Sequence, residues 1–177
     1  MEHLYEKASA SAADLKEQLR FAPRIAVVLG SGLGDLTAGF TDTREIPYAD
    51  IPHFPQSTVA GHKGALLEGN LGDTPVLAME GRFHFYEGYT MKEVCYPFYV
   101  FKLLGIETVV LTNDAGGINR SFEPGTLMLI PDTLNMMGTN PLLRPNHERF
   151  GPRFPCMTDT FNPARRPPAR RAAESSG

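Results

Sequence analysis

An arginine, a histidine and a tyrosine occupy alternate positions in the segment "GRFHFYEGY", residues 81–89. Alternate residues of an extended strand share one face, so we predict a strand or strand end with Arg82, His84 and Tyr86 on its polar side and the phenylalanines toward the core. A guanidinium offers a planar set of donors suited to phosphate oxygens, and the imidazole adds another. This face fits an oxyanion site; a surface strand with an arginine–aromatic stack is the alternative.

Two glycine-rich turns follow apolar runs that we expect to be buried strands. "GSGLG" contains Ser31 and follows residues 24–29, and "NDAGG" contains Asp114 and follows residues 107–112. Backbone N–H groups in such turns can converge on an anion at the edge where an α/β sheet binds ligands. "GSGLG" is neither a Walker A loop nor the dinucleotide fingerprint, so a simple strand-to-helix turn is an alternative. For Asp114, a turn-forming role is the commoner alternative to a catalytic one.

His62 lies between glycines in "AGHKG", just before an expected strand. A histidine in such a loop is more often exposed and without a role, so it matters only if it joins other anion-binding groups. The two glycine turns and the Arg/His face would themselves form an oxyanion cradle.

The order of apolar segments predicts an α/β layer fold, because strands alternate with helices. We expect helices over about the first twenty residues and over residues 91–105, where Pro97 would disturb the early turns. We expect buried strands at residues 24–30, 107–112 and 125–132, and a hairpin over residues 64–80.

The last residues, 162–177, differ in composition from the rest of the chain. They are rich in arginine and proline and lack large aliphatic side chains, and Pro167 and Pro168 should break any helix. We therefore divide the chain into a domain at residues 1–161 and a poorly ordered tail at residues 162–177. A basic arm for nucleic acid is the alternative, which the absence of aromatics and the acidic body disfavour.

Composition narrows the function classes further. The net charge of −3 provides no basic field for nucleic acid or an anionic membrane. Cys95 and Cys156 form no metal-ligand pattern, so we expect free thiols in a reducing compartment. The N-terminus is too charged for a signal peptide and no apolar run is long enough to span a membrane, so we expect a cytoplasmic protein.

The segments "VVLGSGLG", "IPHFPQSTVAGHKG", "GRFHFYEGY", "LTNDAGGIN", "PGTLMLIPDTLN", "NPL" and "HERFGPRFPCMTD" occur in this order along the chain. From about residue 20 to about residue 161 the sequence thereby resembles the trimeric purine nucleoside phosphorylases. The resemblance implies an α/β fold with a mixed central sheet flanked by helices, a homotrimer, and phosphorolysis of purine nucleosides to free base and ribose 1-phosphate. It implies no metal and no cofactor, with inorganic phosphate as co-substrate.

The resemblance also assigns roles to individual residues. Phosphate would lie among Ser31, His62, Arg82, His84 and the backbone N–H of Asp114. Arg82 and His84 would act in catalysis by electrostatics and positioning. Tyr86 would contact the ribose, and Phe154 would reach across a subunit interface to a neighbouring sugar pocket.

Two features depart from the family pattern. Asp114 stands where the family usually has a small neutral residue, and its carboxylate would repel phosphate if it faced the site. The family's later segments, which read the purine and stabilise the departing base, have no counterpart here, so the base-binding residues are unknown and the fold would be incomplete at its C-terminus. We therefore expect a C-terminally truncated, inactive or weakly active phosphorylase.

Three alternatives remain open at this point. The chain could be a non-catalytic module that binds phosphate or a sugar phosphate. It could be a fragment that inserts into trimers of a longer relative through the region of Phe154. It could also be a methylthioadenosine phosphorylase, which belongs to the same superfamily, although "TNDAGG" and "GRFHFYEGY" are closer to the purine nucleoside enzymes.

Overall fold

The computed structural model describes residues 3–30, 32–56, 63–143 and 145–175. The predictions for Ser31 and His62 therefore fall outside the described residues. The chain separates into two compact units, Met1–Asp114 and Ala115–Gly177, and each is considered by itself. The predicted domain boundary at residue 161 stays a prediction.

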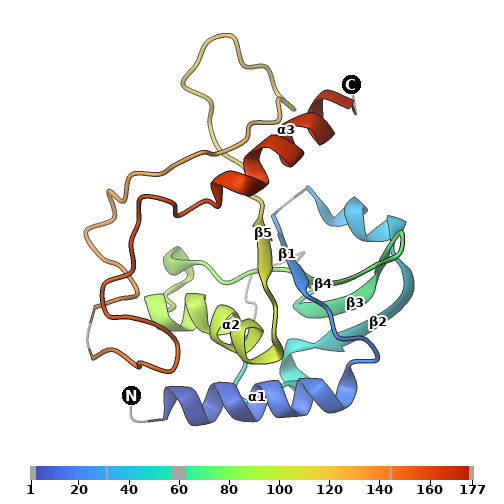
Figure 1. Cartoon of the computed structure of the whole chain (residues 1–177), viewed down its shortest axis with the longest axis vertical. Helices are drawn as coiled ribbons and strands as arrows, with labels where there is room; N and C mark the ends of the chain where they lie inside the picture. Colours follow the sequence, from blue (N-terminus) through green and yellow to red (C-terminus); the bar gives the residue numbers. More distant parts are fainter. Residues whose placement is uncertain (1–2, 31, 57–62, 144, 176–177) are drawn as a thin grey trace. The chain divides into compact units, whose positions relative to one another are not determined.

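The first unit is built on a five-stranded mixed sheet (Figure 1). Its strands are β1 (Ile25–Leu29), β2 (Thr41–Pro47), β3 (Ala65–Leu71), β4 (Thr74–Glu80) and β5 (Thr108–Leu111), in the spatial order β2-β3-β4-β1-β5. β1 pairs in parallel with β4 and β5, whereas β2–β3 and β3–β4 are antiparallel. The predicted mixed α/β sheet is thus confirmed, including the β3–β4 hairpin.

β1 is apolar along its whole length because it lies inside the sheet, between β4 and β5. Its side chains alternate between the two faces, so both faces need apolar neighbours. One face holds a cluster of buried residues, namely Val27, Leu29, Phe40, Leu67, Val76 and Ala78. This packing fixes the C-terminal end of β1, where the candidate site begins.

Two helices lie side by side in the first unit, α1 (Leu4–Gln18) and α2 (Met91–Leu104) (Figure 1). A buried hydrogen bond of 2.8 Å between the hydroxyls of Ser11 and Tyr96 joins them. α2 starts at a Thr90–Glu93 capping box and continues through Pro97, so the expected disturbance of its early turns does not end the helix. Among the helices of the described residues, none is long and apolar enough to cross a membrane.

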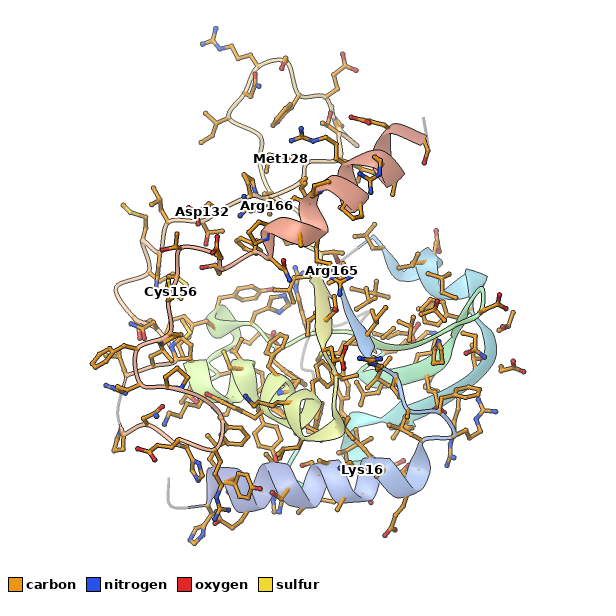
Figure 2. All side chains as sticks on the ribbon, in the orientation of Figure 1. Lys16, Met128, Asp132, Cys156, Arg165 and Arg166 are labelled. Atoms are coloured by element: carbon orange, nitrogen blue, oxygen red, sulfur yellow. The ribbon has the colours of Figure 1, made fainter. Side chains whose placement is uncertain are left out.

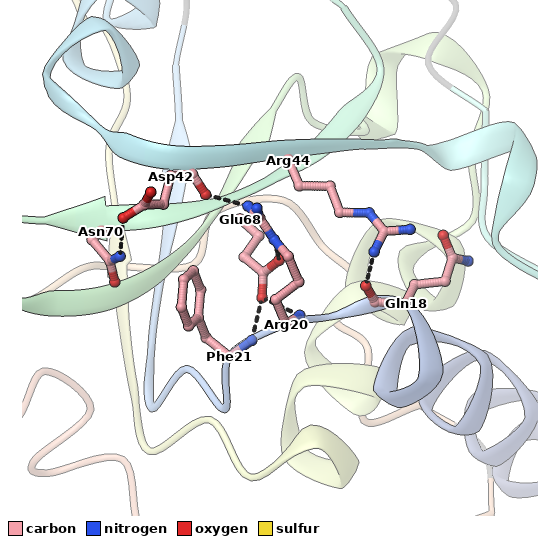
Figure 3. A network of polar contacts seen from close by, with 7 residues as sticks. All are labelled: Gln18, Arg20, Phe21, Asp42, Arg44, Glu68 and Asn70. Carbon is pink, nitrogen blue, oxygen red and sulfur yellow. Dashed lines mark hydrogen bonds and ion pairs between the residues drawn. The ribbon is translucent and has the colours of Figure 1, made fainter.

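A buried carboxylate fixes the chain where it leaves α1 (Figure 3). Glu68 of β3 is fully buried, and its Oε1 accepts the backbone N–H groups of Arg20 and Phe21 at 2.8 and 2.7 Å. The Arg20 side chain adds an Nε–Oε2 contact of 3.4 Å and a bond to the carbonyl of Asp42. The buried charge is therefore compensated, and the segment leading into β1 is held against β3.

The second unit differs from two predictions. Residues 125–132 form no strand. Leu127 is 84% exposed, and Met128 and Asp132, labelled in Figure 2, are exposed too. The prediction was wrong because an apolar run becomes a strand only when another strand pairs with its backbone, and no described strand does so here.

The second difference concerns residues 162–175. A 3₁₀ turn at Pro163–Arg165 leads into α3 (Arg166–Ser175), so the expectation that Pro167 and Pro168 break any helix was wrong. Pro167 and Pro168 do not break this helix because they lie in its first turn, where the backbone N–H groups have no partner within the helix.

Candidate functional site

Arg82 connects the C-terminal ends of three strands of the first unit. β4 ends at Glu80, and after Gly81 the Arg82 Nη1 donates to the carbonyl of Thr112 at 2.7 Å, just beyond β5. The Thr112 hydroxyl donates to the Val28 carbonyl of β1 at 2.9 Å and accepts the backbone N–H of Gly30 at 2.8 Å. The guanidinium is therefore held at the sheet edge where α/β proteins place ligands.

Gly30 permits this close approach. A Cβ added to Gly30 would lie 2.9 Å from Nη1 of Arg82, 3.3 Å from the Thr112 carbonyl oxygen and 3.4 Å from Cα of Asn113. Only a residue without a side chain leaves room for the guanidinium here. The first glycine turn thus has a steric reason, in addition to the anion-binding role that the sequence suggested.

Arg82, His84 and Tyr86 come together, but on a different backbone from the one predicted. β4 ends before them, and Phe85–Glu87 form a 3₁₀ turn, so the prediction of an alternating strand face was wrong. Gly81 has φ +113°, which takes the chain out of the strand. As a result Phe83 is buried as expected, whereas Phe85 is exposed.

The hydrogen bonds of His84 define its tautomer. Arg82 Nε donates to His84 Nε2 at 2.8 Å, and because a guanidinium has only donors, Nε2 must be the acceptor. The ring proton of a neutral His84 then resides on Nδ1, which donates to Glu87 Oε1 at 2.5 Å. In this arrangement His84 orients the arginine and presents no Nε2–H donor of its own, unlike the donor that the sequence suggested.

Tyr86 stacks on the imidazole ring of His84. Its ring lies 4.7 Å from the His84 ring, at 22° between the planes, and it is 78% exposed. An exposed phenol beside an oriented imidazole is available to a ligand with hydroxyl groups, such as a sugar. Arg82 itself uses two of its five N–H groups on His84 and Thr112, which leaves three for a ligand or for residues outside the described ranges.

Tyr48 supports the backbone at Gly81. Its hydroxyl donates to the Gly81 carbonyl at 2.6 Å, and its ring is buried against those of Phe54 and Phe83. Burial, with a smaller contribution from the negative charge of Glu80, raises the pKa of Tyr48 well above its usual range. The phenol therefore remains protonated and keeps donating to Gly81 over the physiological pH range.

The remaining predicted residues are less closely connected. Asp114 is exposed, and its carbonyl accepts the Asn113 side-chain amide at 3.2 Å. Phe154 belongs to the second unit, where it is 87% exposed and lies beside the Arg153 guanidinium. Ser31 and His62 lie outside the described residues, and among those that are described no group of His, Cys, Asp and Glu side chains could hold a metal ion.

Three residues of the site were not singled out from the sequence. Thr112 ties β1 to β5, Glu87 holds His84, and Glu80 accepts hydrogen bonds from Thr37 and Lys63 beside a cavity of about 670 Å³. Thr112 lies in "LTNDAGGIN" and Glu87 in "GRFHFYEGY", where the predictions concerned other residues. A hydroxyl at the end of a parallel strand and a carboxylate three residues after a histidine were the available signals.

Comparison with known proteins identifies the family. Residues 24–177 match the family described as the Phosphorylase superfamily, and the chain belongs to it. The chain is 48% identical over 163 residues to purine nucleoside phosphorylase 1 of Geobacillus stearothermophilus, covering 92% of this chain and 60% of that protein. It is also 48% identical over 164 residues to purine nucleoside phosphorylase of Rattus norvegicus, covering 91% and 57%.

Solved structures give the same result for the fold. A purine nucleoside phosphorylase (isoform 2) of Schistosoma mansoni, in complex with cytosine and ribose-1-phosphate, superposes with a TM-score of 0.90 at 40% identity, covering 97% of this chain and 61% of that one. The Schistosoma mansoni enzyme in complex with inosine gives a TM-score of 0.90 at 38% identity. The resemblance found in the sequence is confirmed, and the chain spans about 60% of the length of these relatives.

Proposed function

We propose that this chain carries the phosphate-binding part of a purine nucleoside phosphorylase. The observation that supports this most directly is the orientation of Arg82, whose guanidinium is held by Thr112 and His84 at the C-terminal ends of β1 and β5. A guanidinium fixed in this way has three further N–H groups that can donate to an oxyanion. Gly30 leaves space for the guanidinium, because a Cβ at this position would lie 2.9 Å from Nη1 of Arg82.

The reaction requires a bound nucleophile beside a sugar cation. The bond between the anomeric carbon and the purine nitrogen breaks, the electron pair leaves with the base, and a phosphate oxygen bonds to the anomeric carbon. As in glycoside hydrolysis, the transition state resembles an oxocarbenium ion, so a phosphate anion held against it is both nucleophile and counter-charge. The protein contributes positioning and electrostatics, which is what an oriented Arg82 provides.

The relatives support the choice of substrates. The related Schistosoma mansoni enzymes were solved in complex with inosine, and with cytosine and ribose-1-phosphate. We propose a purine nucleoside and inorganic phosphate as the substrates of this chain, with no metal or other cofactor. Ser31, His62 and the backbone N–H of Asp114 are proposed as further phosphate donors, and Tyr86 and Phe154 as sugar contacts, the latter across the subunit interface of a cytoplasmic homotrimer.

Phosphate binding and turnover should be tested separately on the purified chain. We expect calorimetry to detect inorganic phosphate binding, and we expect Arg82→Lys to weaken it at least about tenfold, because lysine keeps the charge but loses the planar fork. We expect little or no phosphorolysis of inosine in a steady-state assay. Binding without turnover is the result expected for the phosphate-binding part of the enzyme, whereas no phosphate binding at all would refute the proposal.

A further inference from the structure

Glu80 joins three segments that surround the candidate site. It is the last residue of β4, it is 7% exposed, and it stands two residues before Arg82. Its Oε1 lies 2.9 Å from the Thr37 hydroxyl, and Nζ of Lys63 lies 3.1 and 3.2 Å from its two carboxylate oxygens. One buried carboxylate at the end of β4 therefore contacts the 3₁₀ helix after β1 and the segment before β3.

Both partners lie near positions proposed to bind phosphate in the sequence. Lys63 directly follows His62. Thr37 belongs to the 3₁₀ helix Gly34–Gly39 and comes six residues after Ser31. The Thr37 hydroxyl also lies 2.8 Å from the Gly34 carbonyl oxygen, so its single proton is shared between this carbonyl and the Glu80 carboxylate, and the hydroxyl links the two.

The backbone strengthens the same connection. The N–H of Gly64 donates to the Glu80 carbonyl at 2.9 Å, and Ala65 pairs with Glu80 in the β3–β4 register. Leu29, the last residue of β1, pairs with Glu80 on the other side of β4. Both the backbone and the side chain of Glu80 thus hold the chain segments on either side of β4.

The charge of the buried Glu80 carboxylate has a partner close by. A buried carboxylate alone would be costly and would repel phosphate. Lys63 compensates Glu80, and Nζ of Lys63 also lies 3.9 Å from Oε2 of Glu45. The carboxylate can therefore act as a hydrogen-bond acceptor for Thr37 and as an ionic partner for Lys63 without remaining unpaired.

We propose that Glu80 is a positioning residue of the phosphate site, which sets the glycine turn after β1 and the segment at Lys63 relative to Arg82. The inference rests on the proposed function, and it goes beyond it by assigning a role to a residue that does not touch the ligand. The Thr37 hydroxyl is the link through which Glu80 acts on the glycine turn, since it contacts both Glu80 and Gly34.

The test compares three variants of the whole chain, Thr37→Val, Thr37→Ser and Glu80→Gln. Thr37→Val removes the hydroxyl with little change of shape, whereas Thr37→Ser keeps it and is the matched control. We expect inorganic phosphate to bind about fivefold more weakly to Thr37→Val and about as tightly to Thr37→Ser as to the unaltered chain, from the usual contribution of one hydrogen bond. Glu80→Gln should weaken binding at least as much as Thr37→Val.

Hydrogen exchange in the same samples separates positioning from general destabilisation. We expect faster amide exchange at residues 32–39 in Thr37→Val, with exchange in α1 and α2 unchanged. Unaltered phosphate affinity in a folded Thr37→Val and Glu80→Gln would overturn the role of Glu80 and leave the proposed function standing. Absence of phosphate binding by the unaltered chain would instead refute the proposed function, and with it this inference. If Glu80→Gln does not fold, the comparison of Thr37→Val with Thr37→Ser still decides the question.

Discussion

Replacement of Gly30 by alanine should displace Arg82 and weaken phosphate binding. The new Cβ would lie 2.9 Å from Nη1 of Arg82, which is closer than real Cβ contacts, and 3.3 Å from the Thr112 carbonyl oxygen. Since an arginine side chain is flexible, the guanidinium should move, and the 2.7 Å bond from Nη1 to Thr112 should be lost. A hydrogen bond from a charged group contributes about 1.5–3 kcal/mol.

This loss sets the size of the expected effect. We expect the dissociation constant for inorganic phosphate, measured by calorimetry, to rise about tenfold or more. The free energy of unfolding should fall by about 1–3 kcal/mol, because part of the cost is the lost bond and part is crowding against the backbone at residues 112 and 113.

Gly34→Ala is the matched control. A Cβ added at Gly34 meets nothing within 4 Å, although Gly34 lies only four residues further along the same turn. We therefore expect phosphate affinity close to that of the unaltered chain. If Gly30→Ala binds phosphate as tightly as Gly34→Ala, the packing of Arg82 over Gly30 does not orient the anion site, and the reasoning is refuted.

Three further predictions concern single side chains. Glu68→Ala should lower the free energy of unfolding in urea by about 2–5 kcal/mol, because it empties a buried position and removes the acceptor of two backbone N–H groups. Glu68→Gln keeps an acceptor oxygen and should cost about 1 kcal/mol, and equal losses would contradict this account. Asp114→Ala should tighten phosphate binding, by up to about a hundredfold if the carboxylate faces the anion at ~5 Å, or leave it unchanged, and a clear loss of affinity in calorimetry would exclude repulsion. Hydrogen bonds with Thr158 lower the pKa of the Cys156 thiol, whereas burial raises the pKa of the Cys95 thiol. Cys156 therefore has more thiolate at any given pH, and iodoacetamide should alkylate it first near neutral pH. Peptide mass spectrometry measures the order of labelling, and faster labelling of Cys95 would contradict this prediction.

The sheet was predictable where burial and periodicity agree. β1 is a short apolar run between Pro23 and Gly30, and the β3–β4 hairpin has two apolar segments around a polar turn at Gly72 and Asp73. The run at residues 125–132 is also largely apolar and yet forms no strand. Composition reports that a segment could be buried, but a strand also requires a partner, and the choice of partner is a long-range property.

The candidate site was predictable in its residue types but not in its geometry. Arg82, His84 and Tyr86 lie together as expected. They are only two positions apart in the sequence, so a strand and a turn both keep them near one another. The 3₁₀ turn at Phe85–Glu87 and the acceptor role of His84 depend on Glu87 and on the approach of Arg82 to Thr112, which is distant in the sequence. Alternation could not reveal these contacts.

The bond between Gly30 and Thr112 also bears on the order of folding. It joins residues 82 positions apart, whereas the β3–β4 hairpin closes over only a few residues. Contacts between distant residues carry the larger entropic cost of loop closure and tend to form late. Acquisition of phosphate binding during refolding should therefore lag behind hairpin formation and would serve as a reporter for the final step, the addition of β5 beside β1.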